Sequence, residues 1–256
     1  MFNFFNRNTP KFTVQRDIHA HLLPNIDDGP KTMEESIAMI RLLAKIGYKH
    51  LIATPHIHSD YYPNTKKDIL EKLLVVQTEV KKANIPVTID VAAEYYLDDY
   101  FESLLKEEDL LTLEQTPFVL VECSLLEQSI KTMEYLFKLQ VQKYYPILAH
   151  PERYLYYKEK DYQALLEAGC KFQLNLLSLL GHYGKEVQKR ANFLLKKNWI
   201  HFVGTDAHRL QHVRLIEGFI GSKKANKLLR KHTILNNEFQ SMFPVTTKNN
   251  LAKITC

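Results

Sequence analysis

Eight histidine, aspartate and glutamate residues stand at the ends of apolar runs that have the composition of β-strands. His19 and His21 form a His-X-His pair in one run, and Asp206 and His208 form an Asp-X-His pair in another. Alternate residues of a strand point to the same face, so both members of a pair can reach one metal ion. Imidazole and carboxylate ligands suit Zn, Mn or Fe. The single candidates at the ends of other runs are His56, Glu94, Glu122 and His150.

Each of these residues has an ordinary explanation when it is taken alone. A His-X-His pair is often structural or exposed, and a glutamate after an apolar run can cap a helix or pair with a lysine. The joint pattern resists such explanations, because burying several carboxylates without cations is costly. It predicts a site for more than one metal ion. Asp17 shares the strand face of His19 and is either an acceptor for a ligand histidine or a charge at the strand edge.

The segment His-Pro-Glu-Arg-Tyr, residues 150–154, adds a cation to the predicted site. Arg153 follows His150 by three residues, where the chain leaves the strand. A guanidinium forks onto two oxygens of a phosphate, so an arginine beside a metal site is suited to binding an anion. The ordinary alternative for Arg153 is a surface ion pair.

These side chains need a scaffold that brings the strand ends together. Seven strand-like runs alternate with amphipathic helical patterns, and this order predicts parallel strands joined by crossover helices. A closed (β/α) barrel would gather the strand ends on one face. An open doubly wound sheet is the alternative, although no glycine-rich turn follows the first run. The runs lie at residues 16–23, 49–56, 87–96, 117–124, 145–152, 171–179 and 200–208.

Helical periodicity fills the intervals between these runs. Thr32 and Glu35 have the spacing of a capping box, and Gly47 stands where a C-terminal cap belongs. We predict an N-terminal arm at residues 1–14 and one domain at residues 15–256, whose tail from about residue 232 has no assigned structure. The helical patterns lie at residues 32–48, 66–85, 129–145, 160–169 and 184–199.

Composition disfavours several classes of function. The net charge is +5 and the basic residues are scattered, which argues against a nucleic-acid-binding protein. No apolar run reaches the length of a membrane span. The three cysteines include no Cys-X-X-Cys pair, so we expect a cytoplasmic protein. None has an arginine six positions later, as a nucleophilic phosphatase cysteine would require, and Cys123 is expected to be a packing residue that faces away from the site.

The motifs, taken in order, resemble those of the polymerase-and-histidinol-phosphatase (PHP) superfamily. The likeness rests on DIHAHLLPNIDDGP, ATPH, AAEYYL, VLVECS, LAHPERY and GTDAH, between about residue 15 and about residue 220. DDGP and HPERY are most similar to its branch of manganese-dependent protein-tyrosine phosphatases from bacterial capsular and exopolysaccharide loci. The resemblance implies a distorted, TIM-like barrel of seven β/α units.

The resemblance also implies a site with two to three divalent ions, most often Mn, with Fe or Zn as alternatives. His19, His21, Glu94 and Asp206 would hold the first ion, and Glu94 would bridge to a second, also held by Glu122 and His150. Asp28, His56 and His208 would hold a third, with Asp27 as the rival of Asp28 in the same loop. Arg153 matches the family's phosphate-binding arginine. The catalytic residues implied are Arg153, Glu94 and His56.

The activity implied is hydrolysis of phosphotyrosine by a hydroxide that bridges the metal ions. The expected partner is a phosphotyrosine protein, a membrane-associated bacterial tyrosine kinase of polysaccharide export. Proton donation to the leaving oxygen is open between a metal-bound water, His56, His58 and Asp60. The alternative functions are a small-molecule phosphatase, such as a histidinol phosphatase, and a non-catalytic metal-binding module.

Overall fold

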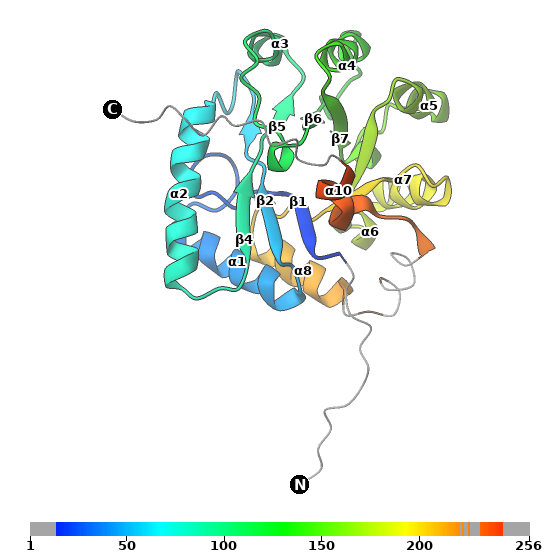
Figure 1. The fold of residues 1–256 in the computed structure, drawn as a ribbon. Helices are drawn as coiled ribbons and strands as arrows, with labels where there is room; N and C mark the ends of the chain where they lie inside the picture. The colour runs from blue at the N-terminus through cyan, green and yellow to red at the C-terminus, as the bar shows by residue number, and fades with distance from the viewer. Residues whose placement is uncertain (1–13, 221, 223–224, 226–230, 243–256) are drawn as a thin grey trace.

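Parallel strands form a barrel with the helices around its outside (Figure 1). We call each position in the barrel wall a stave, because some positions are occupied by two consecutive short strands. The structure, a computed structural model, describes residues 14–220, 222, 225 and 231–242. The expected N-terminal arm lies outside the described residues except for Val14, which is buried. The strands are β1 (Arg16–Ala20), β2 (His50–Ala53), β3 (His56–Ile57), β4 (Thr88–Val91), β5 (Glu94–Tyr96), β6 (Phe118–Glu122), β7 (Tyr145–Ala149), β8 (Lys171–Asn175) and β9 (Phe202–Gly204).

Nine strands make seven staves because two staves are interrupted. β2 and β3 are separated by Thr54 and Pro55, and β4 and β5 by Ala92 and Ala93. The strands therefore pair as two sheets, β1-β2-β4 and β3-β5-β6-β7-β8-β9, and all pairings between named strands are parallel. These breaks distort the barrel in the way the family resemblance implied.

Backbone hydrogen bonds join the first stave to the last. The Asp206 N–H donates to the His19 carbonyl at 2.8 Å, and the His21 N–H donates to the Ala207 carbonyl at 3.0 Å. These bonds hold the two segments with paired ligand candidates side by side. The prediction of a distorted barrel of seven β/α units is confirmed.

The helices follow the predicted patterns, with additions. Thr32 accepts a hydrogen bond from the Glu35 N–H and Gly47 ends the helix at φ 122°, while the Glu35 carboxylate accepts from the Lys31 N–H. None of the described helices is both long and apolar enough to cross a membrane. The helices are α1 (Met33–Ile46), α2 (Lys66–Lys82), α3 (Asp99–Lys106), α4 (Thr132–Val141), α5 (Glu159–Glu167), α6 (Leu176–Leu180), α7 (Lys185–Lys196) and α8 (Leu210–Ile220), with short turns η1 (Leu113–Gln115), η2 (Pro151–Arg153), η3 (Leu235–Glu238) and α10 (Phe239–Met242).

The strand predicted at residues 171–179 is wrong in its second half. β8 ends at Asn175, whose side-chain oxygen accepts a hydrogen bond from the Leu177 N–H at 2.9 Å and starts α6. The run is apolar in both halves, so its hydrophobicity did not show the change from strand to helix. The sequence also gave no prediction of α3 or α8.

Two apolar layers support the barrel. A large core fills the space between strands and helices, and a smaller cluster inside the barrel includes Ile18, Leu120, Ile147 and Phe202. The unassigned tail contributes Asn236, which is fully buried against the end of the barrel opposite the strands' carboxyl ends. Its side-chain oxygen accepts from the Val203 N–H, and its amide group donates to the carbonyls of Arg16 and Val203.

We expect Asn236→Ala to lower the free energy of unfolding by about 2–4 kcal/mol, because it leaves buried backbone groups of β1 and β9 without partners. Urea denaturation followed by circular dichroism would measure the change. Asn192→Ala, on the exposed side of α7, is the control and should change stability by less than about 0.5 kcal/mol. An equal effect of both substitutions would contradict the role given to Asn236.

Candidate metal centre and anion pocket

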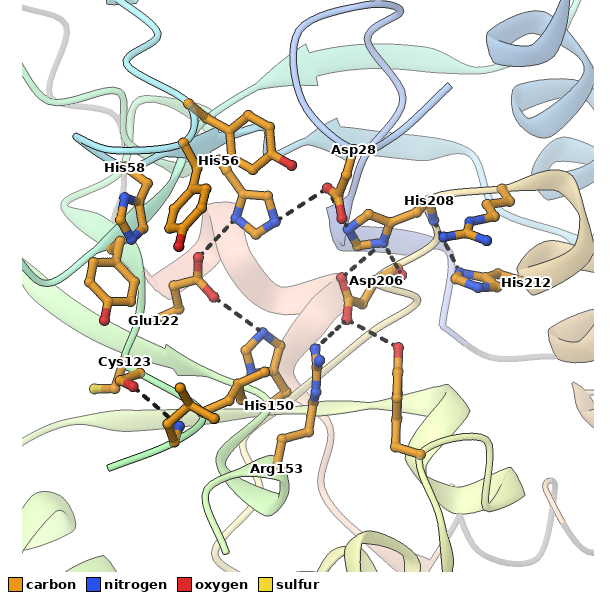
Figure 2. Close-up of a pocket in the computed structure, with 18 residues that line it drawn as sticks. Asp28, His56, His58, Glu122, Cys123, His150, Arg153, Asp206, His208 and His212 are labelled. Atoms are coloured by element: carbon orange, nitrogen blue, oxygen red, sulfur yellow. Dashed lines mark hydrogen bonds and ion pairs between the residues drawn. The ribbon is translucent and has the colours of Figure 1, made fainter. Parts of the chain in front are cut away.

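The candidate ligands meet at the carboxyl ends of the strands, on one wall of a pocket of about 480 Å³ (Figure 2). His19 and Glu94 are completely buried at its base, whereas His56, Glu122 and His208 are partly exposed within it. Their ligand atoms form three overlapping groups. These are His19, His21, Glu94 and Asp206; His56, Glu94 and Glu122; and His21, Asp28, His56 and His208.

The first group contains the four residues that the family resemblance assigned to one ion. His19 Nε2 lies 3.1 Å from Glu94 Oε2 and 3.4 Å from Asp206 Oδ1. His21 Nε2 lies 3.4 Å from the same Glu94 oxygen and 3.5 Å from the same Asp206 oxygen. Ligands bound about 2.1 Å from one ion are separated by distances of this size. The residues therefore fit a divalent ion.

Glu94 connects this group to the second. His56 Nδ1 lies 3.3 Å from Glu94 Oε2 and 2.9 Å from Glu122 Oε1. His150 Nε2 lies 2.9 Å from Glu94 Oε1 and 4.0 Å from Glu122 Oε2. Glu94 thus directs one oxygen to the first group and the other to His150, as a bridging carboxylate would.

The third group settles which of two neighbouring aspartates faces the other ligands. Asp28 Oδ1 lies 3.3 Å from His208 Nε2 and 3.6 Å from His56 Nε2. Asp27 instead accepts a hydrogen bond from His21 Nδ1 at 2.7 Å and from the Gly29 N–H at 2.9 Å. Asp27 therefore orients a ligand, while Asp28 offers an oxygen to the group itself.

The electrostatics of the centre require positive charge. Burial lowers the pKa of His56, but the nearby Glu122 and Glu94 carboxylates outweigh it and raise that pKa to about 9. Burial opposes ionisation of Glu94, yet His19 and His56 hold its pKa well below its ordinary value. Buried carboxylates with several facing imidazoles are stable when protons or metal ions balance them. Divalent ions can do so while the imidazoles stay neutral.

Unusual backbone geometry positions the side chains of three candidate ligands. The β1 register shifts between Asp17 and Ala20, and such a bulge lets His19 face the interior next to the interior residue Ile18. His150 and Asp206 have left-handed backbones, with φ of 35° and 49°. Strained residues of this kind concentrate at functional sites.

Gly204 allows β9 to approach β1 closely. A Cβ at this position would lie 2.6 Å from Gln173 Nε2 and 2.7 Å from His19 Cβ. The two contacts involve a ligand and its hydrogen-bond partner, because Gln173 Oε1 lies 2.8 Å from His19 Nδ1. Any larger residue at position 204 would displace this pair.

Sequence reasoning missed three side chains that support the site. Gln173 fixes the His19 ring, and Asn175 donates to Asp206 Oδ2 at 2.5 Å. Tyr183 also donates to that oxygen, at 3.4 Å. Gln173 and Asn175 are two polar residues at alternate positions of an apolar strand. That spacing was a usable signal, whereas nothing in the sequence pointed to Tyr183.

Arg153 lines the same pocket, beside His150 and on the side opposite His56 (Figure 2). Its Nη1 is 3.4 Å from Asp206 Oδ2, and its guanidinium covers the Tyr183 ring at 4.5 Å. Asp206 thus presents one oxygen to His19 and His21 and the other to Arg153. A surface ion pair, the ordinary alternative, does not describe this arginine, because its partner is a buried candidate ligand.

The two cysteines among the described residues, Cys123 and Cys170, lack the environment of a nucleophile. Burial raises the pKa of the Cys123 thiol to about 12 and that of Cys170 to about 12. Cys123 borders the pocket but belongs to the outer core, and its sulfur lies 3.9 Å from Thr132 Oγ1. This matches the expected packing role.

Asp17 is buried and so is not a charge at the strand edge, and it accepts a hydrogen bond from the backbone N–H of His19 at 3.4 Å and not from its ring. Its carboxylate accepts from the Thr205 hydroxyl at 2.6 Å and from the Thr205 N–H at 3.1 Å. It therefore ties β1 to β9 below the site. Among the other histidines, His50 and His201 bond to Thr88 and to the Phe172 N–H away from the pocket. His212 lines the pocket and accepts from the His208 N–H at 3.3 Å.

A parallel barrel with imidazole and carboxylate groups gathered at the carboxyl ends of its strands defines a (β/α) protein with several clusters that could hold metal ions. The chain belongs to the family described as capsular polysaccharide synthesis, CpsB/CapC, whose model matches residues 15–232. This confirms the resemblance drawn from the motifs.

Individual relatives agree with the family. The tyrosine-protein phosphatase YwqE of Bacillus subtilis is 32% identical over 76% of this chain and 78% of its own length. The tyrosine-protein phosphatase CpsB of Streptococcus agalactiae is 29% identical over 87% of this chain and 99% of its own. A crystal structure from work on B. subtilis YwqE and Streptococcus pneumoniae CpsB, described as metal-dependent tyrosine phosphatases, matches with a TM-score of 0.71 and 30% identity. It covers 86% of this chain and 96% of that chain.

The two aspartates of the loop should respond differently to substitution. Asp28→Ala should lose about one equivalent of bound Mn, because it removes a ligand oxygen. Asp27→Asn should keep the number of ions but weaken affinity about 10–100-fold, since it disturbs the orientation of His21. Metal analysis after dialysis against graded Mn would measure both. Loss of an equivalent only in the Asp27 variant would reverse the assignment.

A second prediction concerns Glu152, which is completely buried. Its Oε1 accepts from the Asn175 N–H and the Ser178 hydroxyl, and burial raises its pKa to about 7. The folded state binds this proton more tightly than the unfolded state, so stability falls as pH rises from about 4.5 to about 7.

Glu152→Gln keeps an accepting oxygen and removes the titration. We expect the metal-free variant to exceed the metal-free parent in unfolding free energy by about 1–3 kcal/mol at pH 8, with a smaller difference at pH 5. Urea melts in chelator at both pH values would test this. A difference independent of pH would exclude Glu152 as the titrating group.

Proposed function

We propose that this protein is a metal-dependent protein-tyrosine phosphatase. The observation that carries the proposal is the set of three overlapping donor groups, two of which share Glu94, with Arg153 lining the same pocket. Divalent ions and an arginine fork are the two devices that bind and polarise a phosphoryl group in hydrolysis of its esters. The names of the relatives, tyrosine-protein phosphatases in two bacterial genera, support the same activity.

The proposed ligands are those that the family resemblance implied. When bound, the ions would bind the phosphoryl oxygens, lower the pKa of a water molecule and stabilise the charge of the transition state. We propose Mn as the metal, with Fe or Zn as alternatives that the same ligand types accept. His19, His21, Glu94 and Asp206 would hold the first ion, Glu94, Glu122 and His150 the second, and Asp28, His56 and His208 the third.

Arg153 would bind the phosphoryl oxygens that face away from the ligands. Asp206 and Tyr183 hold its guanidinium in place, so little side-chain entropy is lost when the anion binds. Asp206 also keeps the arginine charge beside the ligand cluster, where a dianionic phosphate is attracted from both sides. The tyrosyl oxygen, with a pKa near 10, is a better leaving group than an alkoxide.

The pocket wall opposite Arg153 suits the ring of a phosphotyrosine. Tyr62 stacks on His56 with ring centroids 5.5 Å apart, and Tyr96 packs against His58 at 4.1 Å. Leu125 and Leu126 complete this aromatic and apolar side. A polar amino alcohol such as histidinol would gain less from such a wall, which favours the aryl substrate over the small-molecule alternative.

The physiological substrate that we propose is a bacterial tyrosine kinase associated with the membrane and with capsular or exopolysaccharide synthesis. The family description supports the link to capsule synthesis. We propose a cytoplasmic location, where such a kinase would present its phosphotyrosines; the unpaired, buried Cys123 and Cys170 are compatible with it.

The test compares hydrolysis of a phosphotyrosyl peptide and of histidinol phosphate by Mn-loaded protein. We expect the peptide to be preferred and Arg153→Ala to lower its kcat/KM by about 100-fold or more, the cost of removing a charged group that stabilises the transition state. Arg214→Ala, at an exposed position of α8, is the control and should retain full activity. Preference for histidinol phosphate would replace the proposal with the small-molecule activity, and no activity with metal bound would favour a binding module.

A further inference from the structure

Large apolar side chains extend from the rim of the pocket along the outside of α4. Leu125 and Leu126 line the pocket, and their exposed fractions are 43% and 91%. Ile130, four residues further along the chain, is 97% exposed. We call the α4 surface the set Leu125, Leu126, Ile130, Met133, Phe137 and Val141.

The three sides of α4 have different surroundings. Tyr135, Leu136 and Leu139 are buried. On a second side, Lys131 and Lys138 pair with Asp99 and Glu102 of α3, the neighbouring helix in Figure 1. The third side carries Met133, Phe137 and Val141, which are 44%, 66% and 64% exposed.

Spacing makes this third side continuous. Met133, Phe137 and Val141 are separated by four residues each, so they lie on one face of α4, and Ile130 lies in the turn that leads into the helix. Isolated apolar residues on a surface need no explanation, but a contiguous row that meets a binding pocket indicates an interaction site. Leu126, at the start of this apolar segment, lines the pocket. A polypeptide attached to a group bound in the pocket can therefore pass along α4.

We propose that the α4 surface binds the apolar polypeptide that flanks the phosphotyrosine of a protein substrate. This inference rests on the proposed phosphatase function and adds the chemistry of the substrate's flanking residues. The tyrosyl ring enters between Arg153 and the aromatic wall, and the adjoining chain crosses Leu125 and Leu126. Its apolar side chains then bury Ile130, Met133 and Phe137. Because these contacts lie away from the reacting atoms, they act on KM more than on kcat.

The test uses two phosphotyrosyl peptides of about twenty residues, long enough to reach along the helix when extended. One carries leucine at alternate flanking positions and its twin carries serine there. We expect the leucine peptide to have a kcat/KM about tenfold higher, through KM, as partial burial of several leucines would give. Hydrolysis of p-nitrophenyl phosphate reports the basic activity separately.

The combined substitution Ile130→Ser, Met133→Ser and Phe137→Ser should abolish the preference for the leucine peptide and leave p-nitrophenyl phosphate hydrolysis unchanged. The chain supplies a matched control on α2, because Leu70 and Leu74 are also exposed, at 39% and 64%, and do not line the pocket. Leu70→Ser with Leu74→Ser should keep the preference. All five positions are exposed, so the variants should fold.

Each result separates the hypotheses. Equal kcat/KM for the two peptides, or a preference for the leucine peptide that survives the α4 substitutions, overturns the inference. Hydrolysis of p-nitrophenyl phosphate in the same experiment would still support the proposed phosphatase function. If that hydrolysis is absent, the proposed function fails and the substrate surface with it. Light scattering tests whether a second copy of this chain occupies the α4 surface. A dimer that the α4 substitutions dissociate, together with equal kcat/KM for the two peptides, would overturn the inference in favour of self-association.

Discussion

Glu94 is completely buried, and its carboxylate lies within 3.4 Å of ring nitrogens from His19, His21, His56 and His150. A carboxylate in that position is unfavourable unless positive charge surrounds it. The site is therefore organised around one charge that must be compensated, and the four histidines come from three different staves. The barrel brings them together because its parallel strands all end on the same side.

The same constraint extends to the anion-binding side. Asp206 is a candidate ligand through one oxygen and holds Arg153, Asn175 and Tyr183 near the other. The position of Arg153 is thus coupled to that of the ligand cluster. A change that moves Asp206 should disturb the candidate metal centre and the arginine together. The Asp206 backbone is left-handed, and its N–H donates to the His19 carbonyl of β1.

Some of the side chains around the centre hold the candidate ligands in place, and others line the opening through which a substrate reaches them. Beneath it, Gln173, Asp27 and Gly204 fix the imidazoles of His19 and His21 through hydrogen bonds and close packing. Above it, the pocket is lined by partly exposed aromatic and apolar groups, of which Tyr183 contacts the buried Asp206. Because the candidate ligands are buried and the pocket above them is partly exposed, the same phosphoryl chemistry can act on phosphate esters that carry different organic groups.

The sequence alone predicted the order of β/α units and the family, and it placed candidate ligands at the strand ends, because apolar periodicity and motif spacing are local properties of the chain. It did not determine the end of β8, where strand and helix are equally apolar, or the role of Asp17, whose partner Thr205 is 188 residues away. Only the tertiary structure separated Asp27 from Asp28, because a one-residue change in a loop redirects a side chain without altering composition. It also brought Tyr183, in the turn between α6 and α7, and His212 of α8 to the pocket, since segments placed after the strands pack according to the whole barrel.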